Sequence, residues 1–75
     1  MNDENKIKLK ILANTIKEKR LLKGLTQEQL AYLSDLDRTY IGMLERCERN
    51  PSYLTLLKIC KGLDIKLVEL FNENK

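Results

Sequence analysis

The side chains best able to do chemistry stand together in residues 36–50, LDRTYIGMLERCERN. A guanidinium, a hydroxyl and a phenol occupy consecutive positions at Arg38, Thr39 and Tyr40, and a thioether follows at Met43. Arginine can donate two hydrogen bonds to guanine O6 and N7, threonine can contact a base edge or a thymine methyl, and methionine offers apolar contact. This set suits a surface that meets the edges of DNA bases.

Helical periodicity separates this stretch into two sides. On a helix that begins at Arg38, the inner side carries Ile41, Leu44 and Glu45. The outer side carries Thr39, Gly42, Met43 and Arg46, with Arg38 and Tyr40 on its flanks. Glycine costs a helix about 1 kcal/mol relative to alanine, and we interpret Gly42 as clearance for a closely approaching duplex. The alternative is an ordinary solvated helix face.

The elements that must position this surface are signalled by two helix starts. Thr26 and Gln29 have the spacing of a capping box, and Leu25 can pack on Leu30, so a helix should run from Gln27 to about Ser34. The same pattern then repeats. Asp37 is the expected cap of a helix that starts at Arg38, and Leu36 can pack on Ile41. Two short helices joined by residues 34–37, with Asp35 at positive φ, are typical of a helix-turn-helix, here residues 27–47.

Three further helices complete the expected fold. The first spans Ile7–Lys23, with Gly24 in the left-handed conformation at its end. A fourth runs from Ser52 to Lys61 and ends at Gly62. A short fifth covers Leu67–Asn72. We therefore predict a compact all-α fold of five helices in one domain, residues 1–75, with frayed ends at 1–5 and 73–75.

Size and composition agree with this reading. A chain of 75 residues can bury only about 60% of its unfolded surface, which leaves little room for a separate catalytic cleft. Its formal net charge of +3 and pI near 9.0 favour an anionic partner. Basic side chains concentrate in the first predicted helix, at Lys6, Lys8, Lys10, Lys17, Lys19, Arg20 and Lys23.

The sequence lacks the residues that several classes of function need. With no histidine and two cysteines, Cys47 and Cys60, the chain offers neither a metal site nor an activated nucleophile, so we expect no enzyme, no cofactor and free thiols. No run approaches the roughly eighteen apolar residues of a membrane span, and the polar start MNDENK lacks the apolar centre of a secretion signal. A cytoplasmic protein without a membrane partner is expected.

Residues outside the third helix are expected to support it. Gln27 at the start of the second helix, and Arg49, Asn50 and Ser52 after the third, are placed to contact DNA phosphates. Arg46 and Tyr40 could reach sugar or phosphate. Gln29 is assigned to its capping box instead. Arg20 and Glu45 each face inward, and since such charges are seldom buried alone, we predict an ion pair between them.

The segments GLTQEQLA, LDRTYIGMLERCERNPS and LLKICKGLDI together resemble the lambda repressor and Cro type (XRE-like) of helix-turn-helix domain, over about residues 9–71. Within that family, LDRTYI followed by ER and RN is most similar to the controller proteins of bacterial restriction–modification systems. The chain departs from the usual pattern at Ser34, at Gly42 and Met43 after the TYI triplet, and at Cys47.

The resemblance implies a recognition role for the third helix and a supporting role for the second. It implies a homodimer on a palindromic operator that regulates its own gene and times endonuclease expression, as activator or repressor. Two dimers on adjacent sites and contact with RNA polymerase would follow. The full set of expected site residues is: base contacts Arg38, Thr39, Tyr40 and Met43; backbone contacts Gln27, Arg46, Arg49, Asn50 and Ser52; dimer interface Leu67, Val68 and Phe71.

Two other functions stay open at this stage. A phage-type repressor or antitoxin-like autorepressor would use the same surface, and neighbouring genes would distinguish it from a controller. A protein-interaction module that does not bind DNA would associate with duplex weakly and with little dependence on salt, whereas a regulator should lose affinity steeply as salt rises.

Overall fold

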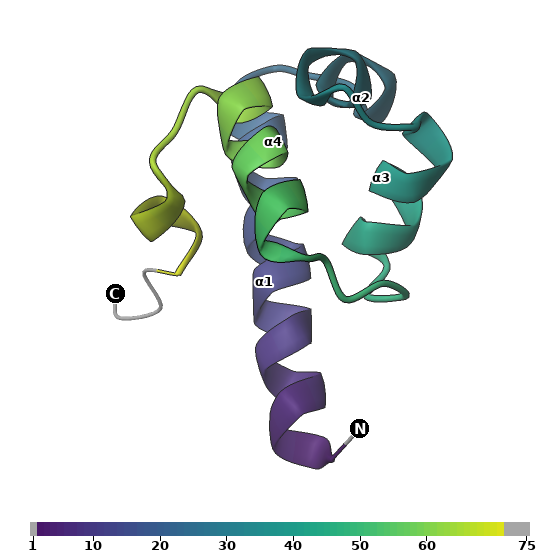
Figure 1. The fold of residues 1–75 in the computed structure, drawn as a ribbon, viewed down its shortest axis with the longest axis vertical. Helices are drawn as coiled ribbons and strands as arrows, with labels where there is room; N and C mark the ends of the chain where they lie inside the picture. Colours follow the sequence, from purple (N-terminus) through teal and green to yellow (C-terminus); the bar gives the residue numbers. More distant parts are fainter. Residues whose placement is uncertain (1, 72–75) are drawn as a thin grey trace.

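The computed structural model of the chain describes residues 2–71, which form four α-helices and one short 3-10 helix. The α-helices are α1 (Asp3–Leu22), α2 (Gln27–Ser34), α3 (Arg38–Glu45) and α4 (Tyr53–Leu63), and the 3-10 helix is η1 (Leu67–Leu70). Within these residues the all-α prediction is confirmed. Helix α3 and η1 lie on opposite sides of α1 and α4, with α2 across one end (Figure 1).

Helix α1 begins earlier than the predicted start at Ile7. Asn2 caps it, since its side chain accepts a hydrogen bond of 2.8 Å from the amide of Asn5, and Asp3 and Glu4 place negative charge in the first turn. The structure thus includes residues 3–5 in a helix where we expected fraying. The expected fraying of residue 1 and of residues 73–75 lies outside the described residues. At the other end Gly24 has φ of 70°, the left-handed conformation predicted for it.

The turn between α2 and α3 has the predicted local chemistry. The Thr26 hydroxyl accepts from the Gln29 amide at 3.0 Å, and the Gln29 side chain accepts from the Thr26 amide at 2.8 Å, which completes the capping box. Asp35 has φ of 55°, and the Asp37 carboxylate accepts from the Thr39 amide at 2.7 Å. The two caps and the positive φ at Asp35 are therefore confirmed, and they set the direction in which α3 leaves the turn.

Helix α3 ends at Glu45, just short of the expected limit at residue 47. Cys47 adopts φ of 65°, and the next amide, that of Glu48, donates to the Met43 carbonyl at 2.8 Å. The Cys47 amide donates to the Leu44 carbonyl at 3.1 Å. This pair of bonds is the Schellman pattern that commonly closes a helix around a glycine. A cysteine occupies the glycine position in this chain.

Helix α4 continues past the predicted end at Lys61 because Gly62 is not its terminator. Ser52 caps its start, and Asp64, with φ of 56°, provides the left-handed residue that ends it. Gly62 lies inside the helix, where an added Cβ would come within 2.2 Å of the Ser34 hydroxyl oxygen. The glycine permits α2 and α4 to approach closely.

The predicted count of five helices is not confirmed, because among the described residues the short fifth segment is a 3-10 helix and not an α-helix. Residues Leu67–Leu70 form a 3-10 helix. The Glu69 amide donates to the Lys66 carbonyl at 2.9 Å, and the Phe71 amide donates to the Val68 carbonyl at 3.1 Å. The Glu69 carboxylate also accepts from the Lys66 amide at 2.9 Å. Asn72, the predicted end of this helix, lies outside the described residues. A segment this short favours the tighter turn.

The core lies where α2 packs against α3 and α4, and α1 and η1 close it from the side. Helix α4 contributes four buried apolar residues to the core: Leu56, Ile59, Cys60 and Leu63. Ile41 and Leu44 of α3 are fully buried. The inner side of α3 is thus fixed by packing, so the direction of its outer side is fixed as well.

Candidate nucleic-acid interface

The outer side of α3 has the residues that its periodicity predicted, with one exception. Arg38, Thr39 and Arg46 are exposed, and Met43 is half-buried. Tyr40 is half-buried, because its side chain packs against the core. The guanidinium of Arg38 and the hydroxyl of Thr39 are therefore accessible at the N-terminus of α3, where the helix dipole favours anions, and Met43 follows one turn after Thr39.

The exception is Gly42, whose predicted outward position and clearance role are wrong. It is buried, and an added Cβ would lie 3.1 Å from Nη1 of Arg46 and 3.5 Å from Oε1 of Gln27. These two side chains, from the end of α3 and the start of α2, fold over the glycine. The space that Gly42 leaves is filled by the protein itself.

A buried ion pair joins α1 to α3, as predicted for Arg20 and Glu45. Nε of Arg20 donates to Oε2 of Glu45 at 2.7 Å and Nη2 donates to Oε1 at 3.1 Å, while the two side chains are only 8% and 2% exposed. Nη1 of Arg20 donates to the carbonyl of Leu25 at 2.7 Å. All three guanidinium nitrogens are bonded, which is the condition under which a buried charge is tolerated.

The same carboxylate also holds Gln27. Nε2 of Gln27 donates to Oε1 of Glu45 at 3.1 Å, and this bond turns Oε1 of Gln27 toward Gly42. Gln27 further lines a hollow of about 380 Å³ together with Thr26, Glu28 and Arg38. The structure therefore brings the predicted phosphate contact Gln27 beside the predicted base contact Arg38, at the point where the starts of α2 and α3 meet.

Arg46 makes a second carboxylate contact, which sequence reasoning did not identify. Its Nε and Nη2 donate to Oε2 and Oε1 of Glu48, each at 3.2 Å, and the two side chains are 59% and 49% exposed. No helical spacing predicts this pair, because it forms across the end of α3 and depends on the left-handed turn at Cys47. An acidic group thus lies directly beside a residue expected to contact DNA.

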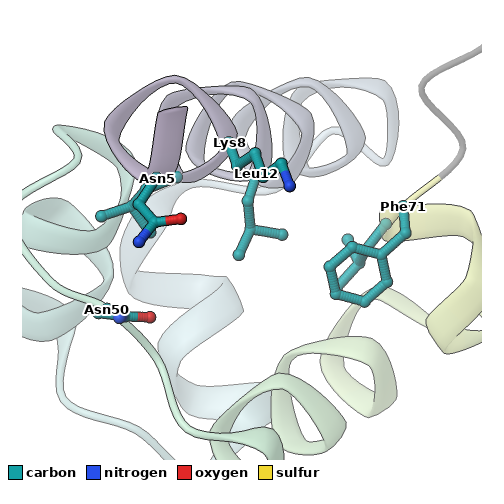
Figure 2. Close-up of a pocket in the computed structure, with 7 residues that line it drawn as sticks. Asn5, Lys8, Leu12, Asn50 and Phe71 are labelled. Carbon is teal, nitrogen blue, oxygen red and sulfur yellow. The ribbon is translucent and has the colours of Figure 1, made fainter. Parts of the chain in front are cut away.

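The loop after α3 presents the remaining predicted backbone contacts. Arg49, Asn50 and Ser52 are all exposed. Ser52 also has a structural role, since its hydroxyl accepts from the Thr55 amide at 3.2 Å and lies 3.0 Å from the Thr55 hydroxyl. Asn50 faces a groove of about 430 Å³ that runs from Asn5 and Lys8 of α1 to Phe71 (Figure 2). The loop therefore lies between α3 and the groove.

The predicted dimer residues differ in their exposure. Val68 and Phe71 are exposed, at 68% and 47%, whereas Leu67 packs partly against the core. The sequence analysis did not single out Leu54, which is 68% exposed on α4.

Among residues 2–71 the structure has no group of side chains suited to a metal ion, and none of the helices in that range is long and apolar enough to span a membrane.

The arrangement of α2 and α3 defines a helix-turn-helix protein, and the family model for the helix-turn-helix matches residues 16–70. The chain belongs to this family. It is 45% identical over 60 residues to Control protein C.SmaI of Serratia marcescens, an alignment that covers 80% of this chain and 71% of the relative. More narrowly, it belongs to the restriction–modification controller proteins, as the following structures also indicate.

Two solved controller proteins superpose on the chain. C.AhdI from Aeromonas hydrophila has a TM-score of 0.84 and 46% sequence identity, covering 87% of this chain and 98% of that one. C.Esp1396I, solved as a tetramer in complex with its natural 35 base-pair operator, has a TM-score of 0.80 and 49% identity, covering 84% of this chain and 83% of that one. The resemblance inferred from the sequence is thereby confirmed.

Proposed function

We propose that this protein is a sequence-specific transcription regulator that binds a palindromic operator as a homodimer and controls a restriction–modification system. The observation that carries the proposal is the outer side of α3. There Arg38 and Thr39 are exposed at the start of a helix whose direction is fixed by the Asp37 cap and by the buried Ile41 and Leu44. Membership of the controller family supports the same conclusion.

The proposed contacts divide by chemistry. Arg38, Thr39, Tyr40 and Met43 meet base edges in the major groove, where a bidentate arginine discriminates guanine. Backbone contacts come from both sides of α3, because the start of α2 crosses the phosphate backbone in this docking mode and the following loop reaches the next phosphates. The backbone set is Gln27, Arg46, Arg49, Asn50 and Ser52.

A dimer would present two copies of α3 about 34 Å apart, one turn of duplex, to matching half-sites. Val68 and Phe71 are its proposed apolar contacts, because both are exposed and because η1 lies on the opposite side of α1 and α4 from α3 (Figure 1). Leu67, which packs partly against the core, is the third proposed residue of the dimer interface. The operator-bound tetramer of C.Esp1396I supports the further proposal that two dimers bind adjacent sites. Contact with RNA polymerase and a location in the bacterial cytoplasm complete the proposal.

The test compares two arginine variants on a duplex from upstream of the protein's own gene and on a random duplex of equal length. Arg38→Ala should cost about 1–3 kcal/mol on the upstream duplex and relax the preference at one base pair. Arg49→Ala should weaken both duplexes similarly and reduce the salt slope by about 1 per contact. Footprinting of the wild-type protein on the upstream DNA gives the site, its symmetry and the number of protomers bound.

Equal losses on both duplexes for Arg38→Ala would refute the assignment of α3 as the reading element. Salt-insensitive, weak association of the wild-type protein with both duplexes would instead favour a protein-interaction module. Both arginines are exposed, so circular dichroism should give the wild-type spectrum for each variant.

A further inference from the structure

The ion pair between Arg46 and Glu48 occupies the part of Arg46 that a DNA phosphate would use. Two parallel N–H···O bonds run from Nε and Nη2 to the two carboxylate oxygens, each at 3.2 Å. Arginine binds phosphate with the same two-bond geometry. While this pair is formed, the best edge of the guanidinium is not free for DNA.

The position of the pair places it on the DNA-facing side proposed above. Nη1 of Arg46 lies over Gly42, next to Oε1 of Gln27 at the start of α2. That end of α2 is the part of a helix-turn-helix that crosses the phosphate backbone. The carboxylate of Glu48, 49% exposed, therefore lies where negative charge repels a duplex.

The backbone holds Glu48 in this place. The left-handed φ of 65° at Cys47 turns the chain back, and the Glu48 amide is bonded to the Met43 carbonyl at 2.8 Å. The Glu48 side chain thus starts close to Arg46 before any duplex is present. Because both side chains are about half exposed, the pair is weak enough to exchange.

We propose that Glu48 competes with DNA phosphate for Arg46, so that each protomer exchanges the Glu48 carboxylate for a phosphate when it binds DNA. The inference rests on the proposed function of the chain as a DNA-binding protein. Since phosphate contacts carry no sequence information, this exchange lowers affinity for operator and random duplex alike. Glu48 would therefore raise the protein concentration at which sites fill without changing which site is preferred.

The experiment is a double-mutant cycle of Glu48→Gln and Arg46→Ala, with binding to the upstream and random duplexes followed by fluorescence anisotropy over a series of salt concentrations. Glu48→Gln should tighten binding to both duplexes by about two- to fivefold per protomer and leave the salt slope close to that of the wild type, because Arg46 contacts a phosphate in both complexes. Arg46→Ala should weaken binding more in the Glu48→Gln background than in the wild type.

The matched control is Asp64→Asn, which removes one negative charge at the C-terminal end of α4. Asparagine tolerates the left-handed conformation of this residue. The Asp64→Asn variant should leave the salt slope of DNA binding unchanged. Tightening by Asp64→Asn equal to that by Glu48→Gln would overturn the proposal, because net charge alone would then explain the gain.

The proposal is also overturned if Glu48→Gln leaves binding unchanged or weakens it, or if Arg46→Ala has the same effect in both backgrounds. In those cases the wild-type protein still binds the upstream duplex, and the proposed function stands. If the wild-type protein binds neither duplex, both proposals fail together. Circular dichroism of each variant verifies that the changes in affinity do not come from unfolding.

Discussion

Gly62 offers a sharp test of how α2 is seated on α4. An alanine Cβ at this position would come within 2.2 Å of Oγ of Ser34, 3.1 Å of Cδ1 of Leu30 and 3.2 Å of the Ser34 backbone nitrogen. Ser34 is 2% exposed and Leu30 is fully buried, so neither neighbour can move into solvent. Gly62→Ala must therefore push α2 and α4 apart or force a side chain from its rotamer.

The expected magnitude follows from two opposed effects. Alanine in place of glycine stabilises a helix interior by about 1 kcal/mol. Overpacking of a well-packed core costs about 1–3 kcal/mol and more when backbone must shift, as the 2.2 Å contact requires. We expect Gly62→Ala to lower the free energy of unfolding by about 2 kcal/mol, which corresponds to a fall in Tm of roughly 10 °C in a domain of this size.

Ser34→Ala supplies the matched second variant. Oγ of Ser34 is buried and has no hydrogen-bond partner among the described residues. Its removal should raise the free energy of unfolding by about 1 kcal/mol, because an unsatisfied polar atom is no longer desolvated. It also removes the nearest atom to the new methyl group. In the Ser34→Ala background, Gly62→Ala should therefore cost less than about 1 kcal/mol.

Urea unfolding followed by circular dichroism measures all four proteins of this cycle, and an unchanged m-value would verify that the unfolded states are comparable. A Gly62→Ala protein as stable as the wild type would refute the close approach of α2 and α4. If Gly62→Ala lowered the free energy of unfolding equally in the wild-type and the Ser34→Ala backgrounds, the Ser34 hydroxyl would not be the source of the steric clash. Either result would contradict the packing that positions the turn before α3.

Two further changes test other parts of the structure. Cys47→Gly should raise the free energy of unfolding by about 0.5–1 kcal/mol in urea melts. Glycine removes the cost of a φ of 65°, and its greater backbone entropy in the unfolded state offsets only part of that gain. The Cys47→Ala variant keeps the same backbone strain and should bring no such gain. Burial, and secondarily the charge of Glu69, raises the pKa of the Cys60 thiol above its ordinary value. The folded state therefore keeps this proton longer than the unfolded state, and the stability advantage of the wild type over Cys60→Ala should shrink as pH rises from neutral to about 10. A difference in stability between the wild type and Cys60→Ala that stays constant across this pH range would contradict the raised pKa of the Cys60 thiol.

Local sequence signals predicted the elements that set α3. The capping box at Thr26 and Gln29, the cap at Asp37 and the left-handed Asp35 each depend on residues close in sequence, so short-range chemistry was enough. The buried charges of Arg20 and Glu45 could be paired because each stood alone on an apolar helix side and only an opposite charge could satisfy the other.

Features that depend on packing between elements were not predictable in this way. Gly42 was assigned to the outer side of α3 by its angle alone, and nothing local to α3 indicates that Gln27 of α2 would cover it. Gly62 carries the usual signal of a helix end, yet its role is contact with Ser34, a residue of another helix. Both glycines are explained by what lies opposite them, which periodicity within one helix does not describe.

Two arginine–glutamate pairs among residues 2–71 have the same two-bond geometry and differ in burial. Arg20 and Glu45 are 8% and 2% exposed, so removing either partner would leave a buried charge unpaired, and no ligand can take its place. Arg46 and Glu48 are 59% and 49% exposed, so water and salt screen their attraction, and this is the pair for which we propose exchange with a DNA phosphate. The difference in burial explains why the first pair can hold α3 in position, and it is the reason that the proposed exchange is assigned to the second pair. Glu45 connects the two regions through Gln27, whose Oε1 lies beside the Arg46 guanidinium over Gly42.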